Sequence, residues 1–199
     1  MLLIDVLVTL PVPKIHLMTR VSLGTMNQWG CQPGAMRLRN HPEFASEVLA
    51  INKLVHPKLA LYDGMHFLDK SGPMIGEPVG MNMMIAANHV GAGDLVCCDL
   101  MGMDVRIVAH LRQGQVGGMV PPDLRGVILN RPPDSFRARS FVLKRAPINY
   151  VALATIHFSS LTRVFYDSVT AGPLDAGRFR LRRNRVVGQL LYGRGGPPA

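Results

Sequence analysis

Residues 11–34 read PVPKIHLMTRVSLGTMNQWGCQPG, and this stretch decides the fold because it joins an apolar segment to a cluster of unusual side chains. It holds the single tryptophan of the chain, together with Lys14, His16, Asn27 and Cys31. Prolines and glycines bound it, and no standard catalytic signature passes through it. The stretch therefore predicts a loop-rich rim beside a sheet, where polar groups gather without specifying a reaction.

Residues 2–10, just ahead of this rim, are rich in Leu, Ile and Val and stop at Pro11. Such a run predicts a strand buried on both faces, as in a parallel sheet covered by helices. Asp5 interrupts the run, no basic region precedes it, and it is about half of the roughly 20 residues that a membrane span needs. It therefore predicts neither a signal peptide nor a transmembrane helix. Because the chain opens directly into this strand, we expect the sheet to lack an N-terminal portion.

The remaining elements alternate along the chain. Apolar spacing and Gly/Pro breaks predict helices at residues 18–29, 42–56, 94–102 and 105–111. Short apolar runs predict strands at residues 59–62, 79–87 and 126–129. Asp94, in the first turn of its helix, is expected to complement the helix dipole. Strands that alternate with helices indicate an α/β domain over residues 1–130, with a mainly parallel sheet flanked by helices.

Charge divides the chain at about residue 130. Residues 1–130 carry ten basic and ten acidic side chains, whereas residues 131–199 carry twelve basic and three acidic ones, which accounts for the whole net charge of +9. An apolar helix is predicted at residues 147–161, followed by the basic run RFRLRRNR at residues 178–185. The sequence therefore predicts a second region, a basic helical extension over residues 131–199.

Three interpretations of this basic extension are open. A solvated face is the first. The second is binding to an anionic membrane surface through residues 178–192, because apolar residues accompany the arginines there. Nucleic-acid contact comes third and is not favoured, since no binding motif goes with the charge. The location predicted is cytoplasmic, with association at the membrane periphery as the alternative.

The three cysteines, Cys31, Cys97 and Cys98, do not form a disulfide framework, because their number is odd and two are adjacent. No iron–sulfur ligand motif is present in the chain. This usage favours a reducing compartment and free, buried thiols. Cys31 in particular is interpreted as a buried packing residue, since no base beside it can be identified.

Several polar residues are candidates for chemistry. Lys14 and His16, two residues apart just past the first strand, are suited to supply a cation and a general base or metal ligand. Asp63 follows a predicted strand, and the carboxyl ends of strands in an open α/β sheet face the ligand crevice. The structural alternative is that His16 and Asp63 satisfy loop backbone groups while Lys14 is solvated.

Metal and anion sites are further alternatives. Asp63 and His66 form a D-x-x-H pair that could hold a metal with His16 or Asp94. The methionine pairs are interpreted as core filler in preference to copper ligands. Gly/Pro turns at residues 72–78 and 91–93 could cradle an anion at a helix start, although the signatures of phosphate-binding loops are missing. The identity of any cofactor is left open.

A set of short motifs in one order resembles domain-of-unknown-function family 362. They are K-I-H at residues 14–16, N-x-x-G-C-x-P-G at residues 27–34, D-G at residues 63–64, G-P with G-E-P at residues 72–78, and Asp94 with L-M-G at residues 100–102. The resemblance covers about residues 2–130. The region after residue 130 also resembles an extension that some members carry. Each motif is common alone, and their order carries the likeness.

The resemblance implies an uncharacterised protein, often associated with iron–sulfur proteins, that lacks the N-terminal portion of the domain. It implies a redox-linked or metal-dependent enzyme acting on a small anionic substrate, with an iron–sulfur or redox partner protein. The alternative is a non-catalytic accessory protein that binds through its basic extension. Met26 in place of a Lys, and His89-Val90 in place of Asp-Pro, imply impaired chemistry. The predicted crevice consists of Lys14, His16, Asn27, Asp63 and Asp94.

Overall fold

The computed structural model describes residues 5–32, 43–73, 75–136, 140–145 and 150. All of them lie in one compact unit, Met1–Leu153. The predictions for residues 151–199, which include the basic run and the membrane-binding segment, lie outside the described residues. No helix in the described part of the chain is long and apolar enough to cross a membrane.

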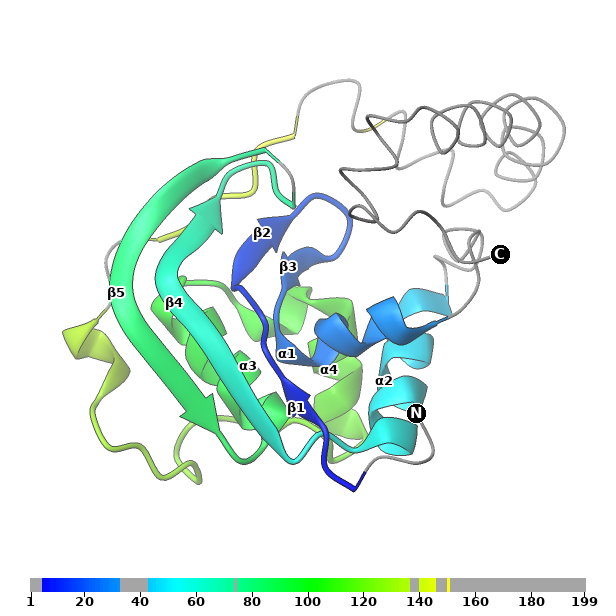
Figure 1. The fold of residues 1–199 in the computed structure, drawn as a ribbon. Coiled ribbons are helices and arrows are strands. Elements are labelled where there is room, and N and C mark those ends of the chain that lie inside the picture. The colour runs from blue at the N-terminus through cyan, green and yellow to red at the C-terminus, as the bar shows by residue number, and fades with distance from the viewer. Residues whose placement is uncertain (1–4, 33–42, 74, 137–139, 146–149, 151–199) are drawn as a thin grey trace, which may run out of the picture. The chain divides into compact units, whose positions relative to one another are not determined.

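A five-stranded sheet forms the centre of this unit (Figure 1). The strands are β1 (Val8–Thr9), β2 (Lys14–His16), β3 (Arg20–Ser22), β4 (Leu59–Asp69) and β5 (Glu77–Ala87). β1 and β2 both run parallel to β4, whereas β5 is antiparallel to β4 and β3 is antiparallel to β2. The sheet is therefore mixed, and β4 is the strand around which the others are arranged.

Helices flank this sheet, and Figure 1 shows α3 and α4 behind it. The helical elements are α1 (Gly24–Asn27), η1 (Gln28–Cys31), α2 (Phe44–Val55), α3 (Val90–Leu100), η3 (Val105–Ile107), α4 (Ala109–Val116) and η4 (Pro133–Ser135). The predicted α/β class is confirmed. α2 ends where its predicted helix ends, because His56 adopts a left-handed conformation with φ of 48°.

The hydrophobic core lies between the sheet and these helices. Strand residues alternate between the two faces of a sheet, and the faces that meet α3 are fully buried at Ile15, Tyr62 and Phe67. Almost the whole of α3 is buried as well, including Cys97 and Cys98. Burial of large apolar side chains on both elements supplies the main stabilising free energy of this unit.

The first strand differs from its prediction. The structure gives β1 two residues, and Val6 and Leu10 beside it are 62% and 68% exposed. The prediction of a strand buried on both faces is therefore wrong for the described part of residues 2–10. The reason is that the described helices cover one face of the sheet in this region (Figure 1), so that Val6, Val8 and Leu10, whose side chains point to the other face, stay exposed.

The helix predicted at residues 18–29 begins as a strand. The chain reverses in a turn at residues 17–19, and Arg20 follows it with φ of 70°. β3 then pairs antiparallel with β2, so that Val21 lies opposite Ile15. Both side chains are fully buried. Pairing these two residues in the core outweighs the helical spacing of the sequence, and only residues 24–31 become helical.

Two further strands differ from their predictions. β4 continues past the Asp63-Gly64 pair to Asp69, with an irregularity in its pairing with β5 near Gly64 that a glycine accommodates. No strand forms at residues 126–129, where Ile128 is fully exposed. The predicted helix at residues 105–111 is split in two, because Val108 is extended between η3 and α4.

Residues 140–145 belong to this unit although they follow residue 130. Phe141 is 4% exposed and belongs to the core. The Val142 N–H donates to Asp69 Oδ1 at 2.8 Å, and the Arg145 guanidinium donates to the carbonyl of Leu17 at 2.8 Å. The division of the chain at residue 130 stays a prediction, since most of the extension lies outside the described residues.

Candidate functional site

Asp94 is fully buried and is the acceptor of a dense hydrogen-bond network. Its Oδ1 accepts from the Gly24 N–H at 2.7 Å and from the Tyr62 hydroxyl at 2.7 Å. Its Oδ2 accepts from the Thr25 N–H at 2.9 Å and the Thr25 hydroxyl at 2.6 Å. Burial raises the pKa of Asp94, while these donors act in the opposite direction. Asp94 therefore joins α3 to the start of α1, and it does not serve the dipole of α3 as the sequence predicted.

The three predicted residues of the rim satisfy local groups. Lys14 Nζ donates to the carbonyl of Val12 at 2.7 Å, and partial burial lowers the pKa of Lys14. His16 Nδ1 accepts from the N–H groups of Met18 and Thr19, each at 3.3 Å. Asn27 Nδ2 donates to Thr9 Oγ1 at 2.9 Å. These contacts fix the rim around β2 and α1. For His16 they agree with the alternative stated above, in which this side chain satisfies backbone groups of a loop.

Asp63 and Asp94 lie on opposite faces of the sheet. Tyr62 points towards Asp94, and the side chain of the next residue along a strand points to the other face. Asp63 is accordingly exposed, and its Oδ1 accepts from the N–H of Met65 at 3.0 Å. The structure therefore does not bring all five predicted crevice residues around one space.

The three cysteines differ in their exposure. Burial raises the pKa values of Cys97 and Cys98, which keeps both thiols protonated and unreactive. Cys31 is exposed at the end of η1, so its interpretation as a buried packing residue is wrong. No group of three or more His, Cys, Asp or Glu side chains in the described part of the chain is arranged to hold a metal ion.

A cleft of about 300 Å³ lies at the N-terminus of α3. Its inner residues are buried and include Thr25, Asn52 and Gly91. Exposed basic side chains stand at its rim: Lys53 near the end of α2, His56 and Lys58 in the connection to β4, and His89 just before α3. The other lining residues are Pro57, Asn88, Val90, Gly118 and Met119. Aspartate and glutamate do not occur among the lining residues.

The N-terminus of α3 leaves two backbone donors at this cleft. The first four N–H groups of a helix have no acceptor within the helix. His89 Nδ1 accepts from the Ala92 N–H at 3.1 Å, and the carbonyl of His89 accepts from the Gly93 N–H at 3.0 Å. Among the described residues, the N–H groups of Val90 and Gly91 have no acceptor, and both residues line the cleft. The helix dipole makes this end of α3 electropositive.

The neighbouring walls of the cleft are fixed by hydrogen bonds. Asn52 Nδ2 donates to the carbonyl of Thr25 at 2.7 Å, which holds α2 against α1. On the other side the N–H of Met119 donates to the carbonyl of Gly114 at 2.8 Å. The backbone of residues 119–120 comes so close to Gly91 that a side chain there would collide with it. Gly91 is therefore required for this wall to approach α3.

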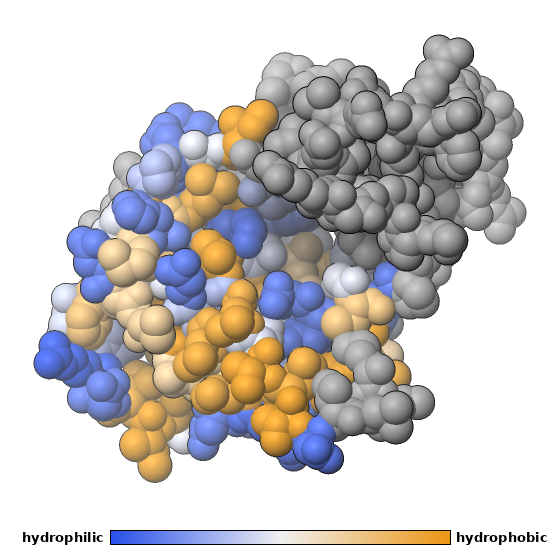
Figure 2. All heavy atoms as spheres, viewed as in Figure 1, coloured by the Kyte–Doolittle hydropathy of each residue, from blue (hydrophilic) through white to orange (hydrophobic). Residues whose placement is uncertain are grey.

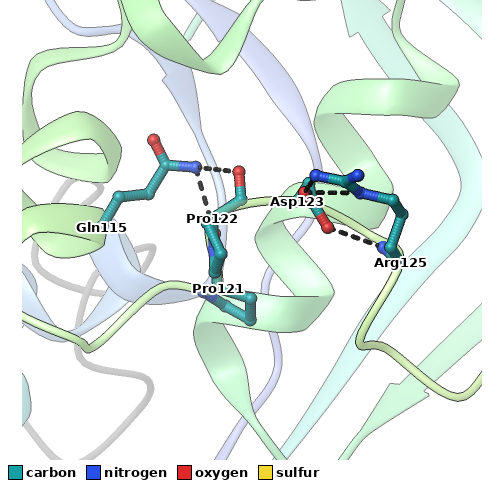
Figure 3. A network of polar contacts seen from close by, with 5 residues as sticks. All are labelled: Gln115, Pro121, Pro122, Asp123 and Arg125. Carbon is teal, nitrogen blue, oxygen red and sulfur yellow. Dashed lines mark hydrogen bonds and ion pairs between the residues drawn. The ribbon is translucent and has the colours of Figure 1, made fainter.

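The loop that follows this wall is fastened to α4. Gln115 Nε2 donates to the carbonyls of Pro121 at 3.0 Å and Pro122 at 2.9 Å (Figure 3). Beyond it, Asp123 and Arg125 form an exposed ion pair at 2.6 Å. The bonds of Gln115 limit the freedom of the chain on both sides of Gly118 and Met119. The cleft is therefore largely preformed.

Sequence reasoning missed most of this cleft. Lys53, His56 and Lys58 stand at the exposed end of a helix, where basic residues are ordinary. They meet residues 88–91 only after β4 and β5 form an antiparallel pair that returns the chain to the end of α2. The signal that pointed to the cleft is the pair of glycines at residues 91 and 93, considered above as a turn that could cradle an anion at a helix start. The turn is wrong, because both glycines lie in the first turn of α3 itself.

Comparison with known proteins supports the resemblance described above. Residues 1–99 match a family model described as a domain of unknown function, DUF362. The chain is 28% identical over 124 residues to a thylakoid-associated protein of Synechocystis sp.; the match covers 59% of this chain and 39% of that protein. This chain therefore spans less than half the length of that relative. No solved structure matches this chain. The resemblance to family 362 is confirmed for residues 1–99.

Proposed function

We propose that this chain, whose residues 1–99 match the DUF362 family, binds a small anionic molecule in the cleft at the N-terminus of α3. One observation carries the proposal: four basic side chains and two backbone N–H groups surround a cleft whose lining contains no acidic residue. Lysine ammonium groups and helix N-termini both favour negative charge, and together they make an anion site.

The size and lining of the cleft narrow the class of ligand. About 300 Å³ is at the lower end of the volumes of small-molecule sites. Pro57, Val90 and Met119 add apolar surface beside the basic rim. The best candidate is a compact phosphate- or carboxylate-bearing molecule with a short organic part. A redox-linked or metal-dependent reaction on that anion, with a redox partner protein, goes beyond binding and stays a prediction from the sequence.

Nuclear magnetic resonance titration of the full chain tests this proposal. Inorganic phosphate and citrate serve as probes for the two anion classes, at constant ionic strength. We expect saturable shifts of the amide signals of Val90, Gly91 and Thr25 with one of the two probes. Two results would contradict specific binding in the cleft: shifts that do not saturate, and equally large shifts of the amide signal of Lys144, an exposed residue that does not line the cleft.

Binding at a membrane periphery is a second candidate. Two observations favour it: the relative is thylakoid-associated, and residues 131–199 carry the whole excess of positive charge. Co-sedimentation with vesicles containing anionic lipid, compared with zwitterionic vesicles, tests it in the full chain. A variant with glutamine at the five arginines of residues 178–185 should lose binding to the anionic vesicles. Equal binding by that variant would remove the role of this segment.

A further inference from the structure

Asn52 brings a hydrogen-bond acceptor to the cleft at the N-terminus of α3. Its side chain is 4% exposed and lines the cleft. Its Nδ2 donates to the carbonyl of Thr25 at 2.7 Å and to the carbonyl of Val48 at 2.8 Å. An asparagine amide has two N–H donors, so these two carbonyls use both of them. They also fix the orientation of the amide, because its nitrogen has to face both carbonyls.

The Oδ1 atom of Asn52 is the polar group that this side chain has left for the cleft. Within the described ranges no group donates a hydrogen bond to this oxygen, and the oxygen is not sealed from the surface. An amide oxygen can accept two hydrogen bonds. Because buried polar groups are nearly always hydrogen-bonded, this oxygen marks a position for a donor on the ligand.

The other groups at the cleft supply donors and positive charge. Val90 and Gly91 offer backbone N–H groups, and Lys53 and Lys58 stand at the rim. Figure 2 shows hydrophilic residues beside apolar ones along the lower edge of the molecule, where α2 ends and β4 begins. An ionised phosphate or carboxylate group accepts from these donors but has no hydrogen to give to Oδ1. Such a group alone therefore leaves Asn52 without a partner.

We propose that the ligand of this cleft is a hydroxylated anion. Its phosphate or carboxylate group binds at the N-terminus of α3, and a hydroxyl on its short organic part donates to Asn52 Oδ1. The inference rests on the anion site proposed above and adds the chemistry of the rest of the ligand. The cleft of about 300 Å³ is small enough for one compact molecule to contact both positions.

A hydroxyl group fits this position better than an ammonium group. Both can donate to an amide oxygen, but an ammonium group also brings a positive charge. Lys53 and Lys58 line the cleft, and no aspartate or glutamate lines it. Like charges placed together in one site disfavour binding. Asn52 is therefore a specificity-determining residue that selects a hydroxyl group without adding charge to the cleft.

Matched pairs of ligands test this inference on the wild-type full chain, by isothermal titration at neutral pH and constant ionic strength. Glycerol phosphate and n-propyl phosphate differ only in hydroxyl groups, and so do malate and succinate. The first pair represents phosphates and the second pair carboxylates. In one of the pairs we expect the hydroxylated member to bind at least about tenfold more tightly, because a site built around a hydroxyl keeps an unpaired polar group when the analogue binds.

The same titrations separate this inference from the anion site on which it rests. Binding with equal affinities within each pair would overturn the hydroxyl position while the anion site stands. Absence of binding by all four molecules would overturn both.

Two variants show which residue reads the hydroxyl group. Asn52→Leu roughly keeps the size of the side chain and removes Oδ1. It should abolish the preference within the pair, while the affinity for the member without the hydroxyl stays within about threefold. Asn88→Leu changes the other asparagine of the cleft, which is exposed. Its effect on both members should be equal, so that their affinity ratio stays that of the wild type.

Asn52→Leu also removes two structural hydrogen bonds, so circular dichroism and a thermal melt establish that the variant is folded. A folded Asn52→Leu that keeps the preference would overturn the role of Asn52, and so would loss of the preference in Asn88→Leu. Where Asn52→Leu does not fold, the ligand pairs on the wild type and on Asn88→Leu decide between the two asparagines.

Discussion

The hydroxyl of Thr25 donates a 2.6 Å hydrogen bond to Oδ2 of Asp94, and Thr25 also lines the cleft at the start of α3. The carboxylate is thus placed behind the cleft, where it fixes the orientation of one of its walls. Asp94 was predicted from the sequence as part of a crevice. In the structure it contributes by positioning Thr25 and the start of α1, while other residues line the cleft.

Removal of the Asp94 carboxylate should therefore destabilise the whole unit. Asp94→Ala removes the acceptor of three buried donors, the Gly24 N–H, the Thr25 N–H and the Thr25 hydroxyl, while the Tyr62 hydroxyl keeps the carbonyl of Val90. Each unsatisfied buried group costs about 1–3 kcal/mol. We expect a loss of about 3–5 kcal/mol in the free energy of unfolding, measured by urea denaturation. Asp63→Ala, which removes an exposed carboxylate, is the control and should change it by less than about 0.5 kcal/mol. A similar small change for both variants would contradict the role assigned to Asp94.

Gly93 tests the packing between α3 and β4. An added Cβ at residue 93 would stand 2.5 Å from the ring of Tyr62, which is fully buried. Alanine is favoured over glycine in a helix by about 1 kcal/mol, but overpacking costs about 1–3 kcal/mol and outweighs it where a large ring cannot move. Gly93→Ala should lower the melting temperature. Gly126→Ala, with no atom within 4 Å of its added Cβ, should not.

His110 makes stability depend on pH. It is 1% exposed, its Nε2 has no hydrogen-bond partner among the described residues, and its ring packs edge-on against Phe44. Burial, with a smaller contribution from the nearby His16, lowers the pKa of His110 from 6.5 to about 4. Because the unfolded state takes up this proton first, stability is complete above pH 6.5 and is lost as the pH falls towards 4.

The size of this loss follows from the same shift. At 1.36 kcal/mol for each pH unit, His110 should reduce the free energy of unfolding by about 3 kcal/mol between pH 6.5 and 4. His110→Leu should therefore flatten the acid side of the stability profile, measured by urea denaturation across this range. The same substitution at the exposed His66 is the control. An unchanged slope for His110→Leu would contradict the protonation of this residue as the cause.

The sequence predicted well those elements whose pattern agrees with their packing. α2 carries regular apolar spacing, and residues 79–87 of β5 form an apolar run interrupted only by Asn82, so both elements lie close to their predicted ranges. β3 was missed because Val21 has helical spacing to Met26 and Trp29 but is buried by pairing with Ile15. Such long-range pairing leaves no mark in the local sequence.

The candidate site divides in the same way. The motifs drew attention to the rim and to Asp94, and those residues do hold β2, α1 and α3 together. The cleft itself depends on Lys53 and Lys58, which reach the start of α3 through the β4–β5 pair. In the sequence, their positions are typical of basic residues at the solvent-exposed end of a helix. Only the tertiary structure shows that both lysines lie at the same cleft.

Isothermal titration of the preferred anion into charge-matched variants tests the central claim, an anion site at the start of α3, most directly. Lys53→Glu/Lys58→Glu reverses two charges at the cleft, and Arg112→Glu/Arg125→Glu reverses two exposed charges that do not line it. We predict that the lysine variant binds at least about tenfold more weakly than wild type, since charge-assisted hydrogen bonds contribute about 1.5–3 kcal/mol each. The arginine variant should stay within about twofold, because only screened charges change. Equal loss of affinity in both variants, or none in either, would contradict the site.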